Sequence, residues 1–113
     1  MITFSRIEKM TKLLPGTEVS TSYGTPAIKV GKRLMLRMHD KEDAIVLLIN
    51  TVEEQQELIL EDPMSFYITD HYKGYPAVLI RPTVEERKFK DLLELAWRRI
   101  ARKSDLVEYD SRV

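Results

Sequence analysis

Two aromatic turn segments decide the fold of this 113-residue chain: Thr21-Ser22-Tyr23-Gly24-Thr25-Pro26-Ala27 and Thr69-Asp70-His71-Tyr72-Lys73-Gly74-Tyr75-Pro76. Each segment joins glycine and proline, which favour turns, to tyrosine. Each also leads directly into an apolar run that is typical of a strand, over residues 27–30 and 77–81 respectively. The two segments therefore predict two turns that each precede a strand.

Apolar periodicity predicts the remaining elements. Ile7, Met10 and Leu14 recur at helical spacing and indicate a first helix that stops at Pro15-Gly16. Alternating or continuous apolar runs predict three further strands, over residues 34–39, 44–49 and 66–69.

Two capping patterns predict the other helices. Thr51 and Thr83 are each followed three residues later by a glutamate, the pattern in which a hydroxyl and a carboxylate cap the first turn. The first pattern begins a helix that ends before Pro63. The second begins a helix whose apolar stripe is Phe89, Leu92, Leu93, Ala96 and Ile100.

This order of elements predicts a compact α+β domain over residues 1–103. We expect an antiparallel sheet of about five strands, with the N- and C-terminal helices on one face and a connecting helix between strands three and four. Residues 104–113 are predicted to form a partly ordered C-terminal tail that the fold does not need.

The composition narrows the possible functions. Lys plus Arg equals Asp plus Glu at 18 each, so the formal charge is zero and bulk attraction to DNA or to an anionic membrane is disfavoured. The absence of cysteine excludes disulfides and thiolate chemistry and fits a cytoplasmic location. No apolar run approaches the roughly 20 residues of a membrane span, so we expect no membrane partner.

The two turn segments, in this order and spacing, resemble the MmcQ/YjbR-like family of small bacterial proteins. The resemblance extends to Lys29, Gly31-Lys32, Asp62-Pro63 and Phe66, and it covers about residues 5–103. It implies a frataxin-like fold, in which terminal helices lie on one face of an antiparallel sheet. It also implies DNA binding, since the family's sheet has been likened to winged DNA-binding surfaces.

The register of the hairpin between the strands at 27–30 and 34–39 determines where its cations point. Opposed residues of a hairpin share a face. A three-residue loop pairs Val30 with Leu34 and Ile28 with Leu36, so the apolar positions match. We prefer this loop to a two-residue loop, which would mismatch them.

Four cations gather in this hairpin with no acid among them: Lys29, Lys32, Arg33 and Arg37. The preferred register places Lys29 and Arg37 on the outer face and the other two at the tip. A cationic hairpin can follow a phosphate backbone, so weak DNA binding is the first functional hypothesis. The alternative is that these cations protect exposed strand edges from aggregation.

A second basic cluster ends the last predicted helix, with Arg98, Arg99 and Arg102. These arginines would extend a DNA-binding surface, or they would simply complement the helix macrodipole. Acidic residues are concentrated elsewhere, on the second predicted helix, at Glu53, Glu54, Glu57, Glu61 and Asp62. Charge is therefore segregated, as a local basic patch requires.

Tyr23, His71, Tyr72 and Tyr75 form the alternative site. If the two turn segments meet in space, their rings would line a small pocket or stack on bases, and the chain would be a small-ligand or protein-interaction module. The other interpretation is a satellite cluster in which the rings only pack together.

Motifs for catalysis are absent from the sequence. His39 and His71 are the only histidines, and neither a nucleophile elbow nor a glycine-rich phosphate loop occurs. We therefore expect a non-enzymatic protein without a cofactor or a metal site, and with no protein partner that the sequence can name.

Overall fold

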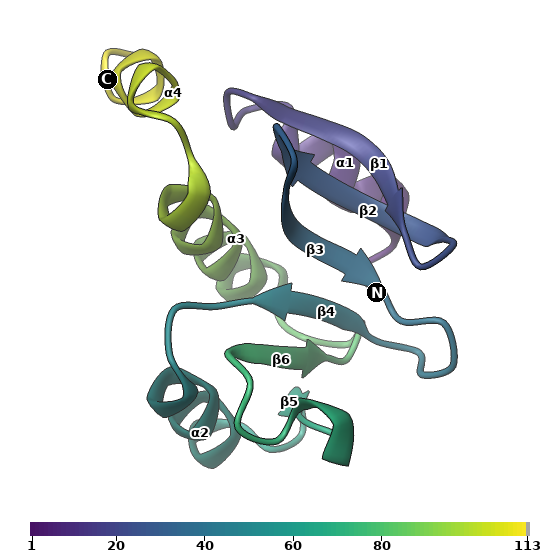
Figure 1. Ribbon diagram of the computed structural model, residues 1–113. Coiled ribbons are helices and arrows are strands. Elements are labelled where there is room, and N and C mark those ends of the chain that lie inside the picture. The colour runs from purple at the N-terminus through teal and green to yellow at the C-terminus, as the bar shows by residue number, and fades with distance from the viewer. Residues whose placement is uncertain (113) are drawn as a thin grey trace.

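The computed structural model describes residues 1–112, which form helices and a single antiparallel sheet (Figure 1). The elements in chain order are α1 (Phe4–Thr11), β1 (Thr17–Ser22), β2 (Thr25–Val30), β3 (Arg33–Met38), β4 (Ile45–Leu48), α2 (Val52–Glu61), β5 (Phe66–Tyr67), the 3-10 helix η1 (Asp70–Tyr72), β6 (Ala77–Ile80), α3 (Glu86–Ile100) and α4 (Lys103–Asp110).

The α+β fold is confirmed, but the sheet has six strands rather than about five, in the order β1-β2-β3-β4-β6-β5. All neighbouring strands are antiparallel. The additional strand is β1, which carries only one apolar side chain, Val19, and therefore lacks the alternation that marks a strand in sequence. Its main-chain pairing with β2, from Thr17–Val30 to Ser22–Thr25, makes it a strand.

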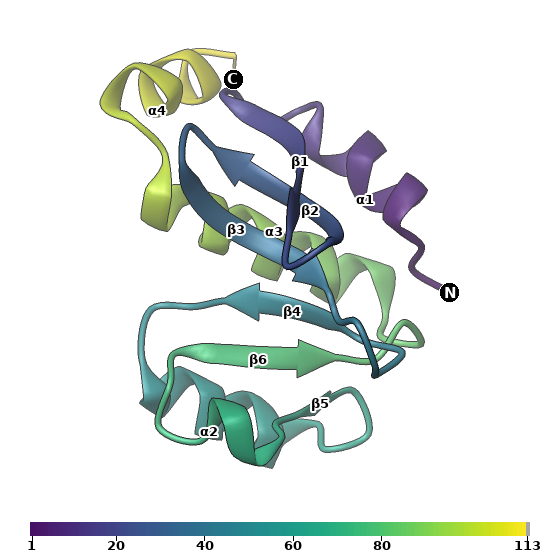
Figure 2. The same cartoon turned by 45° about the vertical axis from the view of Figure 1, so that its right-hand side comes forward.

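Helices α1 and α3 cover one face of the sheet (Figures 1 and 2). Apolar residues of α1 and α3 pack with those of β2, β3, β4 and β6 in the main core, and Leu58 and Ile59 of α2 join its margin. Trp97 lies fully buried in this core, and its indole Nε1 donates to the carbonyl of Pro15 at 2.8 Å. The expected placement of the terminal helices on one face is thus confirmed.

Residues 103–110 form a fourth helix, α4, where the sequence suggested a partly ordered tail. Tyr109 packs edge-on against Trp97 at 4.9 Å between ring centroids and donates its hydroxyl to Glu94 at 2.8 Å. Asp105 is buried and accepts from the backbone and the guanidinium of Arg102. The sequence missed this helix because so short a segment depends on the contacts of Tyr109 with Trp97 and Glu94 of α3.

The hairpin of β2 and β3 has a two-residue loop, so the expected three-residue loop was wrong. Val30 pairs with Arg33, whereas Ile28 pairs with Leu36 as expected. A bulge between the Lys29–Leu34 and Ile28–Leu36 pairs explains how the loop can be shorter than expected while the Ile28–Leu36 pair is kept. It inserts Met35 as an extra residue and restores the apolar match that a simple two-residue loop would have lost.

The two predicted helix caps have different outcomes. Thr51 caps α2, since its hydroxyl accepts from the backbone N–H of Glu54 at 3.1 Å. The cap at Thr83 was wrong, because α3 begins at Glu86 and its N-cap residue, Glu85, makes no side-chain cap. Glu86 instead pairs with Arg6 of α1.

No helix within residues 1–112 is both long enough and apolar enough to cross a lipid bilayer.

Candidate functional site

The face of the sheet opposite the helices, which we call the open face, carries its own small core. Its buried residues are Ala44, Val46, Tyr72, Ala77 and Leu79; Tyr72 comes from η1, and the others come from the strands or their ends. Across this face Arg37 of β3 lies directly opposite Val46 of β4, which lies opposite Leu79 of β6. The register therefore places a guanidinium in an otherwise apolar row.

The two aromatic turn segments meet over Arg37. The Arg37 guanidinium lies 5.3 Å from the ring centroid of Tyr23, and its Nη2 donates to the hydroxyl of Tyr72 at 2.5 Å. The ring of His71 packs edge-on against that of Tyr72, with 4.9 Å between the ring centroids, and the ring centroid of Tyr75 lies 6.3 Å from that of Tyr72. The spatial condition that the pocket hypothesis required is therefore met.

Two adjoining cavities open on either side of this junction. One has a volume of about 390 Å³ and lies over the strands, with Leu34, Val46, Leu48 and Tyr75 in its lining. The other has a volume of about 550 Å³ and extends toward the turn that follows β3, with His39, Asp40, Lys41 and Glu42 in its lining. Both are lined by the same four residues at the junction: Tyr23, Arg37, His71 and Tyr72.

Tyr23 occupies a strained position. Tyr23 and Gly24 both have positive φ, at 53° and 76°, as a two-residue type I′ hairpin turn between β1 and β2 requires. Among residues 1–112 no other non-glycine residue has a positive φ, and a bulky residue rarely adopts this conformation. The tyrosine nevertheless remains there, 87% exposed, with its ring above Arg37.

Gln55 of α2 fixes the second aromatic segment, although the sequence patterns did not single it out. It is 1% exposed, and its Nε2 lies at 3.1, 2.7 and 2.7 Å from the carbonyl oxygens of Tyr72, Tyr75 and Ala77. An amide has two N–H donors, so the three carbonyls share them. A signal was present, because Gln55 lies three residues after Val52 and four before Ile59, on the inward stripe of the helix.

Arg37 is buried without a carboxylate partner. Its side chain is 8% exposed, and within residues 1–112 its hydrogen bonds go only to the Tyr72 hydroxyl and, at 3.3 Å, to the Met38 carbonyl. A guanidinium has five N–H donors, so some of those of Arg37 have no protein acceptor among these residues, and these are within reach of solvent rather than sealed in the core. Buried arginines are usually paired with an acid because burying an isolated charge is costly.

The hairpin cations do not share one surface. Lys29 lies on the open face opposite Leu34, which lines the smaller cavity. Arg33 pairs with Val30, a residue of the helix-side core, so it projects toward the helices. Lys32 is exposed at the tip, and Arg37 is covered by the two tyrosines.

The second basic cluster is largely neutralised. Arg98 pairs with Glu94 at 3.2 Å and with Asp110 at 2.8 Å, and Arg102 pairs with Asp105 at 2.9 Å. These carboxylates raise the pKa of both arginines. Only Arg99 of this cluster has no acidic partner within residues 1–112.

Two histidines and two acids line the larger cavity, namely His39, His71, Asp40 and Glu42. The Nδ1 of His39 accepts from the backbone N–H groups of Lys41 and Glu42 at 3.0 and 2.9 Å, so this ring stabilises the turn after β3. The described part of the chain contains no cluster of three histidine, aspartate or glutamate side chains that would hold a metal ion.

Comparison with known proteins places this architecture in a family. The YjbR family model matches residues 13–99. The uncharacterized protein Mb2600 of Mycobacterium bovis and the uncharacterized protein Rv2570 of Mycobacterium tuberculosis are each 25% identical to the chain, over 80% of it and 84% of their own length. The crystal structure of Deinococcus radiodurans protein DR2400, a DUF419 domain, superposes with a TM-score of 0.76 at 18% identity, covering 97% of this chain and 89% of that one.

Proposed function

The chain belongs to the YjbR family, and we propose that it is a non-enzymatic binding module whose open face takes a small planar anion. The ligand would be an aromatic carboxylate or a nucleotide-like phosphate. Its charged group would meet Arg37, and its ring would lie against the tyrosines and His71.

The observation that carries this proposal is the unpaired guanidinium of Arg37. Its burial at 8% exposure costs free energy unless an anion compensates it. No residue among 1–112 supplies that anion, and Arg37 lines both cavities of the open face. A ligand carboxylate or phosphate would accept charge-assisted hydrogen bonds there.

Aromatic side chains determine the shape of the ligand. Tyr23 and His71 are exposed, and Tyr75 is 50% exposed, so their rings have free faces beside the guanidinium. Base or ring stacking on such faces contributes about 1–3 kcal/mol per ring. The strained backbone at Tyr23 supports the same interpretation, because strain is retained most often at binding sites.

Two matched ligand pairs test the proposal by calorimetric titration: adenosine monophosphate against adenosine, and 2-naphthoate against 2-naphthylmethanol. A hydrogen bond to a charged group contributes about 1.5–3 kcal/mol, which corresponds to about 10- to 100-fold in affinity. We expect each anion to bind more tightly than its neutral counterpart by this factor. The substitution Arg37→Met should abolish that preference.

Arg81→Met is the matched control. Arg81 also stacks on a tyrosine, at 4.2 Å from the ring of Tyr67, but it lines neither cavity. Its loss should leave the preference for the anion unchanged. A preference that survives Arg37→Met, or that disappears equally in both variants, would contradict the proposal.

Weak DNA binding by the hairpin tip is the second candidate. Arg33 lies close enough to Arg99 to lower the pKa of Arg99. The exposed Lys32 is next to Arg33 in the chain, so these cations favour this candidate. Each phosphate contact contributes about 0.9 to the slope of log affinity against log salt. Replacing Lys32 and Arg33 by alanine should therefore reduce the slope by about 1.8.

Fluorescence anisotropy with a labelled duplex at several salt concentrations measures this slope. The control is the pair Lys9→Ala and Lys12→Ala on and just after α1, which are exposed cations away from the hairpin. Equal slopes in the two double variants, or no binding at low salt, would remove DNA binding as a candidate.

A further inference from the structure

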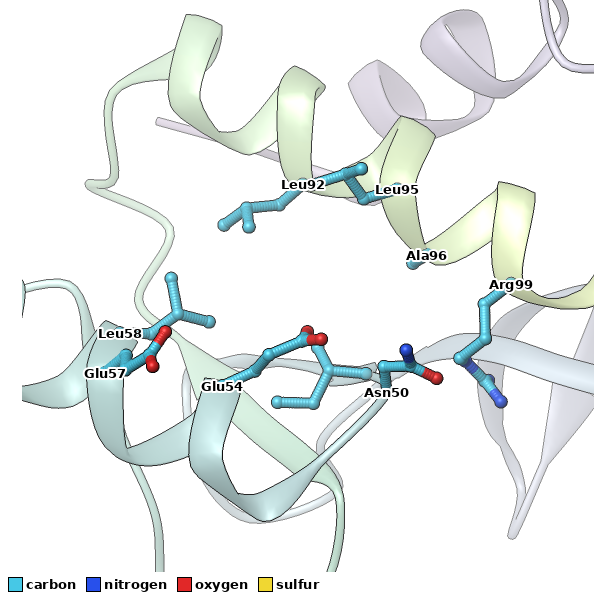
Figure 3. A pocket seen from close by; sticks show the side chains of 9 residues that line it. Asn50, Glu54, Glu57, Leu58, Leu92, Leu95, Ala96 and Arg99 are labelled. Carbon is cyan, nitrogen blue, oxygen red and sulfur yellow. The ribbon is translucent and has the colours of Figure 1, made fainter.

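Another cavity, of about 500 Å³, lies away from the open face, between α2 and α3 (Figure 3). Ile49 and Asn50, which follow β4, lie between the two helices. Leu58 of α2 faces Leu92 and Leu95 of α3 across the gap. Leu95 is 63% exposed, so the cleft presents apolar side chains to solvent.

Charged groups of both signs line this cleft. Glu54 and Glu57 come from α2, and Arg99 comes from α3 at the end marked by Asn50 (Figure 3). No ion pair joins Arg99 to either glutamate in the described structure. Glu54 is nevertheless near enough to act on the charge of Arg99. The two signs thus face the same space without neutralising each other by contact.

Arg99 lacks the partners that a half-buried arginine requires. Its Nε is the one buried side-chain polar atom in residues 1–112 that has no hydrogen-bond partner. Burial lowers the pKa of Arg99, and the neighbouring Arg33 lowers it further. The terminal nitrogens of Arg99 also have no protein acceptor within the described residues but are within reach of solvent, so an acceptor bound to them at this end of the cleft would be stabilised.

The charge pattern selects the ligand. A simple anion would be repelled by Glu54 and Glu57, and a simple cation would be repelled by Arg99 and Arg33. We propose that the cleft binds a small apolar zwitterion, namely an α-amino acid with an apolar side chain. Its carboxylate would meet Arg99 and Asn50, its ammonium would meet Glu54, and its side chain would lie among the leucines. This site is separate from the open face and does not depend on the function proposed there.

Four ligands test the proposal on the unaltered protein: leucine, glycine, N-acetyl-leucine and leucinamide. Binding is followed by amide chemical shifts in two-dimensional NMR, which also locate the site. We expect leucine to shift residues of α2 and α3 around the cleft in a saturable way. Glycine lacks the apolar side chain, N-acetyl-leucine lacks the ammonium, and leucinamide lacks the carboxylate. Each should bind at least about tenfold more weakly than leucine. For the two blocked derivatives the reason is the loss of a hydrogen bond to a charged group, and for glycine it is the loss of apolar surface buried in the cleft.

Two substitutions assign the charges. Arg99→Met should weaken leucine binding by about tenfold or more while leaving the already weak binding of leucinamide unchanged. Glu54→Gln should likewise weaken leucine binding while leaving the already weak binding of N-acetyl-leucine unchanged. The controls Arg87→Met on α3 and Glu53→Gln on α2 remove exposed charges outside the cleft and should have no effect.

Three outcomes would overturn the proposal. The first is the absence of saturable shifts with leucine. The second is equal binding of leucine and its two blocked derivatives, which would show apolar insertion alone. The third is saturable shifts confined to the open face. The ligand comparison uses only the unaltered protein, so these three outcomes can be read even if one of the variants fails to fold.

Discussion

The helix-covered face and the open face of the sheet each bury an aromatic ring that carries a polar atom, but the hydrogen-bond partner of that atom differs between the two faces. On the covered face the indole of Trp97 donates to a neutral carbonyl, that of Pro15, and the surroundings are apolar. On the open face the hydroxyl of Tyr72 accepts from the unpaired guanidinium of Arg37. The first arrangement is complete in itself, whereas the second leaves a positive charge that an anion can compensate.

This difference separates stability from binding. The covered face removes its large apolar side chains from water and needs nothing further. The open face retains a buried charge and a strained tyrosine, both of which cost free energy in the unliganded protein. Substitutions on the two faces should therefore differ in size and, in one case, in sign.

The largest effect is expected for Trp97→Ala on the covered face. It removes a fully buried ring, and such truncations cost about 3–5 kcal/mol of the free energy of unfolding. Urea denaturation measures the loss. Leu95→Ala, on the same helix but 63% exposed, is the control and should stay within about 0.5 kcal/mol of the unaltered protein. Similar losses in both variants would mean that Trp97 is not the centre of this core.

A smaller loss is expected for Gly16→Ala, where the covered face meets α4. Gly16 has a φ of +82°, and an added Cβ would lie 2.7 Å from the Oδ2 of Asp105. The variant should lose about 1–3 kcal/mol, because both the backbone and the docking of α4 are strained. The free energy of unfolding in urea again provides the measurement.

Gly74→Ala isolates the contribution of docking at Gly16. Gly74 has a similar φ of +76°, but an added Cβ would have no neighbour within 4 Å. Its cost should be that of the backbone alone, about 1–2 kcal/mol. If the two variants lose the same amount, the added Cβ at Gly16 is accommodated without disturbing the docking of α4.

The smallest effect, with the opposite sign, is expected for Tyr23→Asn on the open face. Asn-Gly is the preferred pair for a type I′ turn, so the substitution relieves backbone strain. It also removes the contact of the Tyr23 ring with Arg37, which at an exposed site contributes about 0.5–1 kcal/mol. We expect a net gain in stability of less than about 1 kcal/mol.

Differential scanning calorimetry and ligand titration together decide that prediction. The melting temperature should rise slightly while affinity for the planar anion falls. A lower melting temperature would show that Tyr23 is a stabilising residue and that its backbone strain has no connection with binding.

Local sequence patterns identified most elements but not their relations. The spacing of Ile7, Met10 and Leu14 and the cap at Thr51 specify α1 and α2 because they act within a few residues. Strand β1 escaped because its pairing with β2, rather than its side chains, forms it. The bulge at Met35 escaped because only the match between opposed strands requires it.

The candidate residues illustrate the same limit. The sequence identified the aromatic segments and Arg37 but assigned Arg37 to the cationic hairpin. The expected placement of Arg37 on the outer face is confirmed, but its contact with Tyr72, 35 residues away, depends on the tertiary structure. Arg98 and Arg102, which the sequence offered for a DNA-binding surface or as complements to the helix macrodipole, are paired with carboxylates from α3 and α4.

By itself, then, the sequence determined the elements whose causes are local: turns at glycine, amphipathic helices, apolar strands and the family that their order indicates. The tertiary structure alone decided which charges are neutralised, which are buried without a partner, and which rings surround them. The physical reason is that electrostatic free energy depends on distance and burial in space, and residues far apart in the chain set both.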